Sequence, residues 1–123
     1  MTEKVLIVEG NEDLCRLLQK SFRRKGIDAF SVTDPIMALT LFVQHMADRS
    51  PFAKVYLDCD LPHEKAQQTA QILRNIEREA PKNYPVPHLQ IIGTTNRPWF
   101  GTEDGRQFGM DEVVGRWMGK ATV

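Results

Sequence analysis

Two aspartates near the middle of the chain, Asp58 and Asp60, are the residues best placed to carry chemistry. They follow a short apolar run, residues 55–57, whose composition favours a β-strand, and Pro62 soon afterwards cannot continue a strand. Ligands of open α/β sheets bind at the carboxyl ends of the strands, so an aspartate there is a candidate site. The alternative for this stretch is a solvated turn rich in aspartate.

Three further polar residues, Glu9, Thr95 and Arg116, also follow runs that predict strands. If these strands are parallel and joined by right-handed crossovers, their carboxyl ends meet at one edge of a sheet. We therefore expect Glu9, Asp58, Thr95 and Arg116 to line one acidic pocket. The runs that precede the three residues are residues 5–8, 88–93 and 111–114.

Helical patterns alternate with these runs, which predicts an α/β fold with a doubly wound parallel sheet. Residues 27–32 form a weaker strand candidate, and the segment 97–109 contains too many glycines for more than a short helix. Asp34 and Pro35 predict a helix cap, and Gly26 predicts a helix end. The expected inward apolar positions are Leu14, Leu17, Leu18 and Phe22 in the first helix, Ile36, Leu39, Phe42, Val43 and Met46 in the second, and Ile72, Leu73 and Ile76 in a third that spans residues 63–80.

Length and composition indicate one globular domain, residues 1–123. Apolar residues make up 41% and charged residues 26%, and sixteen basic residues balance sixteen acidic ones, which argues against nucleic-acid binding. The sequence shows neither a membrane-spanning run nor a signal peptide, so we expect a cytoplasmic protein without membrane insertion. Cys15 and Cys59 are expected to be reduced thiols.

The order of these segments resembles the receiver domains of two-component response regulators, from Lys4 to about Met118. Residues 5–8 with the acidic turn after them are similar to the family's first strand and acid pair. Residues 57–62 (Leu-Asp-Cys-Asp-Leu-Pro) look like its phosphoacceptor loop, and residues 91–96 (Ile-Ile-Gly-Thr-Thr-Asn) are similar to the stretch with its hydroxyl residue. Residues 109–113 resemble the run before its lysine. These motifs are most similar to those of the receivers of hybrid histidine kinases. The resemblance implies a flavodoxin-like, five-stranded parallel sheet.

The resemblance implies that Asp58 accepts a phosphoryl group from a histidine kinase or a phosphotransfer domain, and that Thr95 hydrogen-bonds the acyl phosphate. It also implies an Mg²⁺ site formed by Glu9, Asp58 and Asp60, the last through its main-chain carbonyl or its carboxylate. Gly10 stands where the family has its second acid. Because Mg²⁺ is usually held by one or two carboxylates, this site is expected to be weak.

Other departures concern the last third of the chain. Arg116 replaces the family's lysine and could clamp Asp58 with two hydrogen bonds, or it points into solvent. Val113 replaces the family's switching aromatic residue. The fourth helix is expected to be weak and the fifth missing or truncated, so a homodimer or an adjacent domain would cover the exposed apolar face.

Three functions follow as hypotheses. The first is a phosphorylation-responsive receiver, which is a signalling domain and not an enzyme acting on a separate substrate. The second is a pseudo-receiver, which uses the same fold for protein interaction without phosphoryl chemistry. The third is a small phosphatase using the acids, which is disfavoured because no general base or glycine-rich phosphate loop accompanies them. Trp99 and Phe100 are either an exposed docking pair or a plug for the weak fourth helix.

Overall fold

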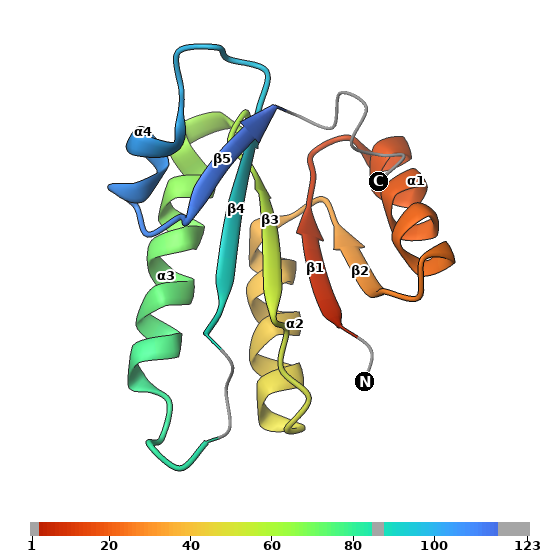
Figure 1. The fold of residues 1–123 in the computed structure, drawn as a ribbon, viewed down its shortest axis with the longest axis vertical. Coiled ribbons are helices and arrows are strands. Elements are labelled where there is room, and N and C mark those ends of the chain that lie inside the picture. The colour runs from red at the N-terminus through yellow and green to blue at the C-terminus, as the bar shows by residue number, and fades with distance from the viewer. Residues whose placement is uncertain (1–2, 85–87, 116–123) are drawn as a thin grey trace.

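The computed structural model describes residues 3–84 and 88–115, which contain one parallel five-stranded sheet in the order β2-β1-β3-β4-β5 (Figure 1). All neighbouring strands pair in parallel, which confirms the predicted doubly wound α/β architecture. The strands are β1 (Lys4–Val8), β2 (Asp28–Val32), β3 (Lys54–Asp58), β4 (Gln90–Thr95) and β5 (Glu112–Gly115).

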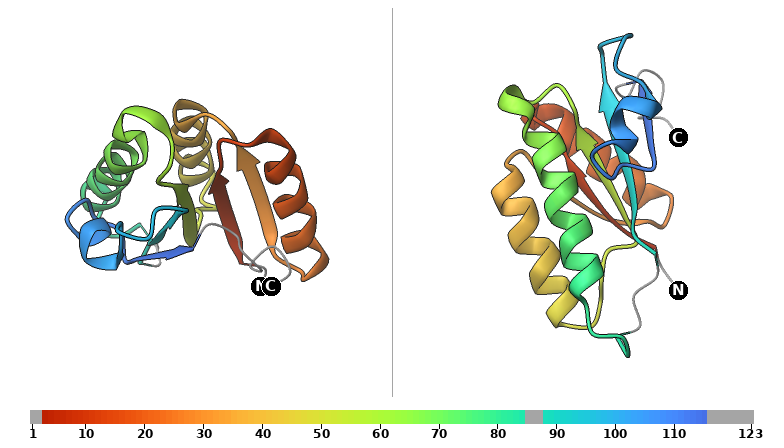
Figure 2. Two further views of the ribbon diagram at one scale, coloured as in Figure 1. Left: turned by 90° about the horizontal axis from the view of Figure 1, so that it is seen from above. Right: turned by 90° about the vertical axis from the view of Figure 1, so that its left-hand side faces the viewer.

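The helices cover both faces of the sheet, with α1 on one face and α2 and α3 side by side on the other (Figure 2). Alternate residues of β1 account for both layers. Val5 and Ile7 pack with α1, whereas Leu6 and Val8 belong to the larger core beneath α2 and α3. The helices are α1 (Glu12–Arg24), α2 (Pro35–Ala47), α3 (Lys65–Glu79) and the short α4 (Thr102–Arg106).

Local sequence signals set the helix ends as predicted. The Asp34 side chain accepts a hydrogen bond from the N–H of Ile36, and Pro35 occupies the first turn of α2. Asn11, rather than one of the acids beside it, caps α1 by accepting from the N–H of Leu14. Gly26 follows α1 with a φ of +82°, a conformation that a side chain disfavours.

Four apolar residues that were predicted to face inward are exposed instead, and those predictions were wrong. Other residues of the same helices occupy the inward positions: Cys15 and Leu18 in α1, Ala38 and Phe42 in α2, and Ala70 and Leu73 in α3. Periodicity alone does not distinguish two adjacent apolar positions on a helix, and a small inward residue such as Ala38 allows the helix to approach the sheet closely. The four exposed residues are Leu17, Ile36, Val43 and Ile72.

The third helix also begins later than predicted. A short 3₁₀ turn, Pro62–Glu64, precedes α3, and both His63 and Glu64 have left-handed backbone conformations, with φ of 59° and 55°. Such conformations cost on the order of 1 kcal/mol or more for residues other than glycine. The loop that follows Asp58 is therefore a strained segment, and His63 points to solvent rather than into the site.

The structure of the last third of the chain agrees in part with what the sequence predicts. The fourth helix is five residues long, as its glycines indicated. Arg116, Trp117 and the positions where a fifth helix would begin lie outside the described residues. In the described part of the chain, every helix is too short or too polar to span a bilayer.

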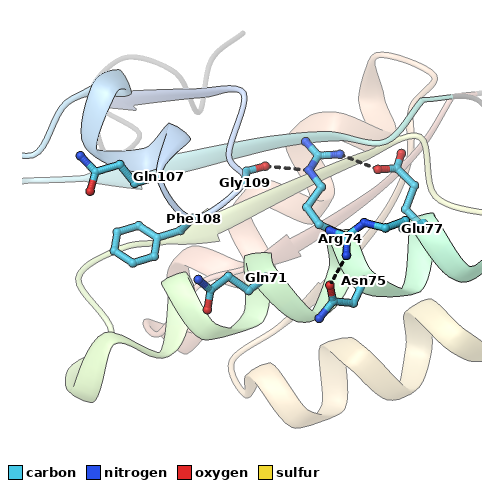
Figure 3. Close-up of a pocket in the computed structure, with 8 residues that line it drawn as sticks. Gln71, Arg74, Asn75, Glu77, Gln107, Phe108 and Gly109 are labelled. Atoms are coloured by element: carbon cyan, nitrogen blue, oxygen red, sulfur yellow. Dashed lines mark hydrogen bonds and ion pairs between the residues drawn. The ribbon is translucent and has the colours of Figure 1, made fainter.

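Arg74 of α3 holds the amino ends of β4 and β5 in place. Its guanidinium donates to the carbonyl of Leu89 at 2.6 Å, just before β4, and to the carbonyl of Gly109 at 2.7 Å, before β5. It also pairs with Asp111 at 2.7 Å and Glu77 at 2.9 Å. Arg74 also lines a groove of about 660 Å³ between α3 and the α4 segment. Figure 3 shows Arg74 on α3 with its guanidinium directed at Gly109.

Candidate functional site

Asp58 ends β3 at the carboxyl edge of the sheet, and its side chain is 2% exposed. One carboxylate oxygen, Oδ2, accepts a hydrogen bond from the main-chain N–H of Gly10 at 3.0 Å. The other, Oδ1, accepts from the N–H of Asp60 at 2.9 Å. Main-chain donors from two different loops therefore fix the orientation of this carboxylate and stabilise its negative charge.

Glu9 directly follows the neighbouring strand β1 and is fully buried. Its Oε2 accepts from the N–H of Asn11 at 2.8 Å. The thiol of Cys15 donates to the main-chain carbonyl of Glu9 at 3.1 Å, and burial followed by the charges of Glu9 and Asp58 raises the pKa of that thiol. The structure therefore brings Glu9 and Asp58 to the same buried corner, as the strand ends predicted.

Thr95 is the third predicted site residue, and it is buried at the end of β4. Its hydroxyl donates to Oδ1 of Asp60 at 2.6 Å, while the N–H of Asn96 donates to Oδ2 of Asp60 at 2.8 Å. Thr95 is thus linked to Asp58 through Asp60, whose carboxylate faces the β4 end of the site. Arg116, the fourth predicted residue, lies outside the described residues.

Arg97 is a site residue to which sequence reasoning gave no role. Its Nε lies 3.2 Å from Oδ1 of Asp60, its Nη2 donates to the main-chain carbonyl of Cys59, and its guanidinium lies 5.3 Å from the ring centre of Phe100. Its position two residues after Thr95, just beyond a predicted strand, was the available signal in the sequence. Arg97 places a positive charge beside the acidic pocket.

The donor set is chemically suited to Mg²⁺, because carboxylate and carbonyl oxygens are the ligands that this ion prefers. Within residues 3–84 and 88–115, however, acidic, histidine and cysteine side chains form no group of three or more suited to hold a metal ion. The carboxylate of Asp60 is committed to Thr95, Asn96 and Arg97. Any contribution of Asp60 to a metal site would therefore come from its main-chain carbonyl, as the resemblance implies.

Cys59 lies beside Asp58, but its thiol is unreactive. The side chain is 1% exposed, and its thiol lies 3.8 Å from the sulfur of Met110. Burial, together with the negative charge of Asp58, raises the pKa of Cys59 to about 12. The thiolate that redox chemistry needs is therefore suppressed, so Cys59 acts as a small apolar residue of the core.

An open groove borders the site on the β5 side. Its volume is about 490 Å³, and it is lined by the loop after β4, including Thr95 and Arg97, and by residues of β5, including Val113. Trp99 in this loop is 72% exposed, whereas Phe100 packs against the main core. The two aromatic residues therefore behave differently: Phe100 fills the space beside α4, and Trp99 faces solvent.

Comparison of this chain with known proteins gives matches at the level of structure. No family model and no curated protein sequence matches it. The receiver domain of the histidine kinase CKI1 from Arabidopsis thaliana, solved with Mg²⁺ and BeF₃⁻, is similar with a TM-score of 0.76 and 21% identity. That match covers 98% of this chain and 85% of the other.

Two bacterial proteins give similar results. The chemotaxis response regulator CheY4 of Vibrio cholerae matches with a TM-score of 0.76 and 14% identity, over 99% of this chain and 93% of that one. HP1043, an orphan response regulator of H. pylori, matches with a TM-score of 0.71 and 13% identity, over 98% and 87% of the two chains. The strand order, the acids at the strand ends and these likenesses agree: this chain has the flavodoxin-like fold of response regulator receiver domains.

Proposed function

We propose that this chain is a cytoplasmic receiver domain that accepts a phosphoryl group on Asp58 from a histidine kinase or a phosphotransfer domain. The observation that carries the proposal is the setting of Asp58. It ends the central strand β3, both of its carboxylate oxygens are held by main-chain N–H groups, and a second buried acid, Glu9, directly follows the adjacent strand β1. A nucleophile in phosphoryl transfer requires this kind of positioning.

The chemistry uses the Asp58 carboxylate as the nucleophile. One of its oxygens attacks the phosphorus of a phosphohistidine, and a P–O bond forms as the P–N bond breaks. The imidazole leaves with the electron pair and takes up a proton, and Asp58 becomes an acyl phosphate. The protein contributes orientation, through Gly10 and Asp60, and groups that offset the charge on the transferred oxygens.

Thr95 and two arginines supply those groups in this proposal. The Thr95 hydroxyl would leave Asp60 and donate to a phosphoryl oxygen, and this exchange would loosen the contact between Asp60 and Arg97. Arg116 would provide the fixed positive charge that a lysine provides in the family. Phosphorylation adds about −1.5 to −2 charges at pH 7, enough to reposition the loop that carries Thr95 and Arg97 and so to signal to a partner.

Mg²⁺ would be held weakly by Asp58, Glu9 and the main-chain carbonyl of Asp60, and its role when bound would be to neutralise phosphoryl charge.

Gly10→Asp restores the family's second acid and should raise the affinity for Mg²⁺ about tenfold or more, as measured by NMR titration without any phosphodonor. A β-carbon at residue 10 lies 3.0 Å from a methyl carbon of Leu61 and 3.2 Å from Oδ2 of Asp58, so the Leu61 side chain must shift slightly. Gly10→Asn, which has the same size without the charge, is the matched control.

The pseudo-receiver remains the second candidate, and the glycine at residue 10 is the observation that favours it. With one family acid missing, the fold could serve as a protein-interaction module whose Asp58 is never phosphorylated. Incubation with acetyl phosphate and Mg²⁺, followed by intact-mass measurement, separates the two. We expect one added phosphoryl group, which Asp58→Asn abolishes and the exposed-site control Asp13→Asn retains. A complete absence of the adduct at saturating donor would favour the pseudo-receiver.

A further inference from the structure

The outward surface of α2 is mostly apolar, with Thr40 and Gln44 as its exposed polar residues, and it carries no acidic, lysine or arginine side chain. Between Asp34 and Asp48 the sequence contains no Asp, Glu, Lys or Arg. Ile36 is 70% exposed, Met37 56% and Val43 49%. Exposed apolar side chains are ordinary when scattered, but a contiguous set on one helix marks an interaction surface.

The spacing of the exposed residues gives this surface a direction. Ile36, Thr40, Val43 and Ala47 are all exposed, and they follow one another at intervals of four, three and four residues. Residues at these intervals lie in one line along a helix, on the side opposite the buried Ala38 and Phe42. We call this line the α2 stripe. It has the pattern by which one helix packs along another.

We propose that the α2 stripe is the interface of a homodimer in which the α2 helices of two copies run antiparallel about a two-fold axis. This interface lies away from Asp58 and does not depend on phosphoryl transfer. In an isologous interface, residue i of one copy meets residue j of the other, and j meets i. An axis passing midway along the stripe sets Ile36 opposite Ala47 and Thr40 opposite Val43. Each large side chain then faces a small or medium one.

The ends of the helix favour this antiparallel arrangement and a second copy as the occupant. The antiparallel pair aligns the positive start of each helix dipole with the negative end of the other, whereas a parallel pair would bring like ends together. The same symmetry that pairs Ile36 with Ala47 sets Asp34, which caps the start of α2, opposite Asp48 and Arg49, which follow its end and whose charges cancel. A parallel pair would instead bring Asp34 against Asp34. The surface is thus complementary to itself in side-chain size and in helix dipole.

The size of the stripe predicts a weak dimer. A helix of 13 residues is about 20 Å long, so the contact falls in the range of small, transient interfaces, below about 1,200 Å² in total. Ile72 of α3, also exposed, lies beside Ile36 at the edge of the stripe and enlarges the contact. We therefore expect a monomer–dimer equilibrium that shifts with protein concentration.

Sedimentation velocity over a dilution series tests the interface. Val43→Glu should weaken dimerisation at least about tenfold, because it places a charge in the centre of the stripe. Leu17→Glu is the matched control: Leu17 is 54% exposed on α1, so the same change in chemistry should leave the dimer intact. Circular dichroism checks that both variants fold. A protein that stays monomeric at all concentrations, or a dimer unaffected by Val43→Glu, would overturn the proposal.

Disulfide trapping tests the orientation. Chains carrying Ile36→Cys should crosslink with chains carrying Ala47→Cys when the two are mixed, and neither variant should crosslink alone. The native thiols, Cys15 and Cys59, are buried and should not compete. Crosslinking of each variant with itself, but not with the other, would show a parallel pair and would contradict the antiparallel dimer.

Discussion

The sheet has an amino edge, where its parallel strands begin, and a carboxyl edge, where they end. Each of these edges holds an arginine against an aspartate, but the two pairs differ in their surroundings. At the amino edge, Arg74 is 16% exposed and binds two main-chain carbonyls as well as Asp111 and Glu77. At the carboxyl edge, Arg97 is 37% exposed and holds Asp60 at 3.2 Å. The less exposed pair, Arg74 with Asp111, holds the strands in position. The more exposed pair, Arg97 with Asp60, can exchange partners, as the proposed phosphorylation-responsive site requires.

The same contrast appears in the backbone. Near the amino edge, Arg74 joins the segments before β4 and β5 to α3 by hydrogen bonds of 2.6–2.7 Å to the carbonyls of Leu89 and Gly109. Near the carboxyl edge, the loop after Asp58 passes through two consecutive left-handed residues, His63 and Glu64, whereas the segment before β3 at the amino edge has one such non-glycine residue, Arg49. Strained backbone of this kind is common where a segment must change conformation. The fold thus combines a rigid amino edge with a carboxyl edge that is suited to rearrangement.

The largest expected effect of a single substitution is at Arg74. Arg74→Met should lower the free energy of unfolding by about 3–5 kcal/mol, because it leaves the carbonyls of Leu89 and Gly109 without this donor and removes the cationic partner of Asp111. Urea denaturation measures this loss. Arg78→Met on the exposed side of the same helix is the control and should change stability by about 0.5 kcal/mol or less. A loss below about 1 kcal/mol for Arg74→Met would show that the amino edge does not depend on this arginine.

Alkaline pH should lower the stability of the whole fold. Burial raises the pKa of Cys59 to about 12, and it also raises the pKa values of Cys15 and Tyr56. Because these groups lose their protons at lower pH in the unfolded chain than in the folded one, the folded state binds more protons above about pH 9. The free energy of unfolding should therefore fall as pH rises from 9 towards 12, by at most about 1.4 kcal/mol per pH unit for each group.

Urea denaturation at several pH values measures this slope, and Cys59→Ala should make it shallower. Labelling of the folded protein with a thiol reagent gives a second readout, since both cysteines are buried and should react slowly until the chain unfolds. If Cys59 labels rapidly at pH 8, then the thiol is more accessible than the structure indicates, and the assignment of Cys59 to the core is wrong.

The smallest expected effect on stability is at Arg97. Arg97→Ala should cost about 1 kcal/mol or less, since the pair with Asp60 is partly exposed and solvent screens it. The loss of stability should be smaller still in 1 M NaCl, because the Debye screening length is then about 3 Å. The cost of Arg74→Met should persist under the same conditions. Equal salt sensitivity of the two variants would remove the proposed difference between the edges.

The sequence predicts the carboxyl edge well because local signals set the strand ends. Apolar runs stop at Glu9, Asp58 and Thr95, and parallel pairing then brings these residues together without further information. Asp34 and Gly26 set helix ends through equally local chemistry. These features depend on a few neighbouring residues, which is why reading the chain in order is sufficient for them.

Other features depend on how distant segments pack, and the sequence did not predict them. Leu17, Ile36 and Val43 have the periodicity of core residues, but the helices are oriented so that Leu18, Ala38 and Phe42 are buried instead. The role of Arg97 arises because the segment after β4, which carries Arg97, lies beside the segment after β3, which carries Asp60. For the same reason the sequence did not predict that the carboxylate of Asp60 is directed at Thr95 and Arg97, while the role of Asp60 as a metal ligand through its main-chain carbonyl stays a prediction.

The central claim is that Asp58 is the phosphoacceptor in the pocket at the carboxyl edge, and chemical trapping tests it most directly. After incubation with a phosphohistidine donor, borohydride reduces an acyl phosphate on aspartate to homoserine, and peptide mass mapping then locates the modified residue. We predict homoserine at position 58 in the donor-treated protein and none in an untreated sample. Conversion at another aspartate, or none at any position with an active donor, would contradict the account.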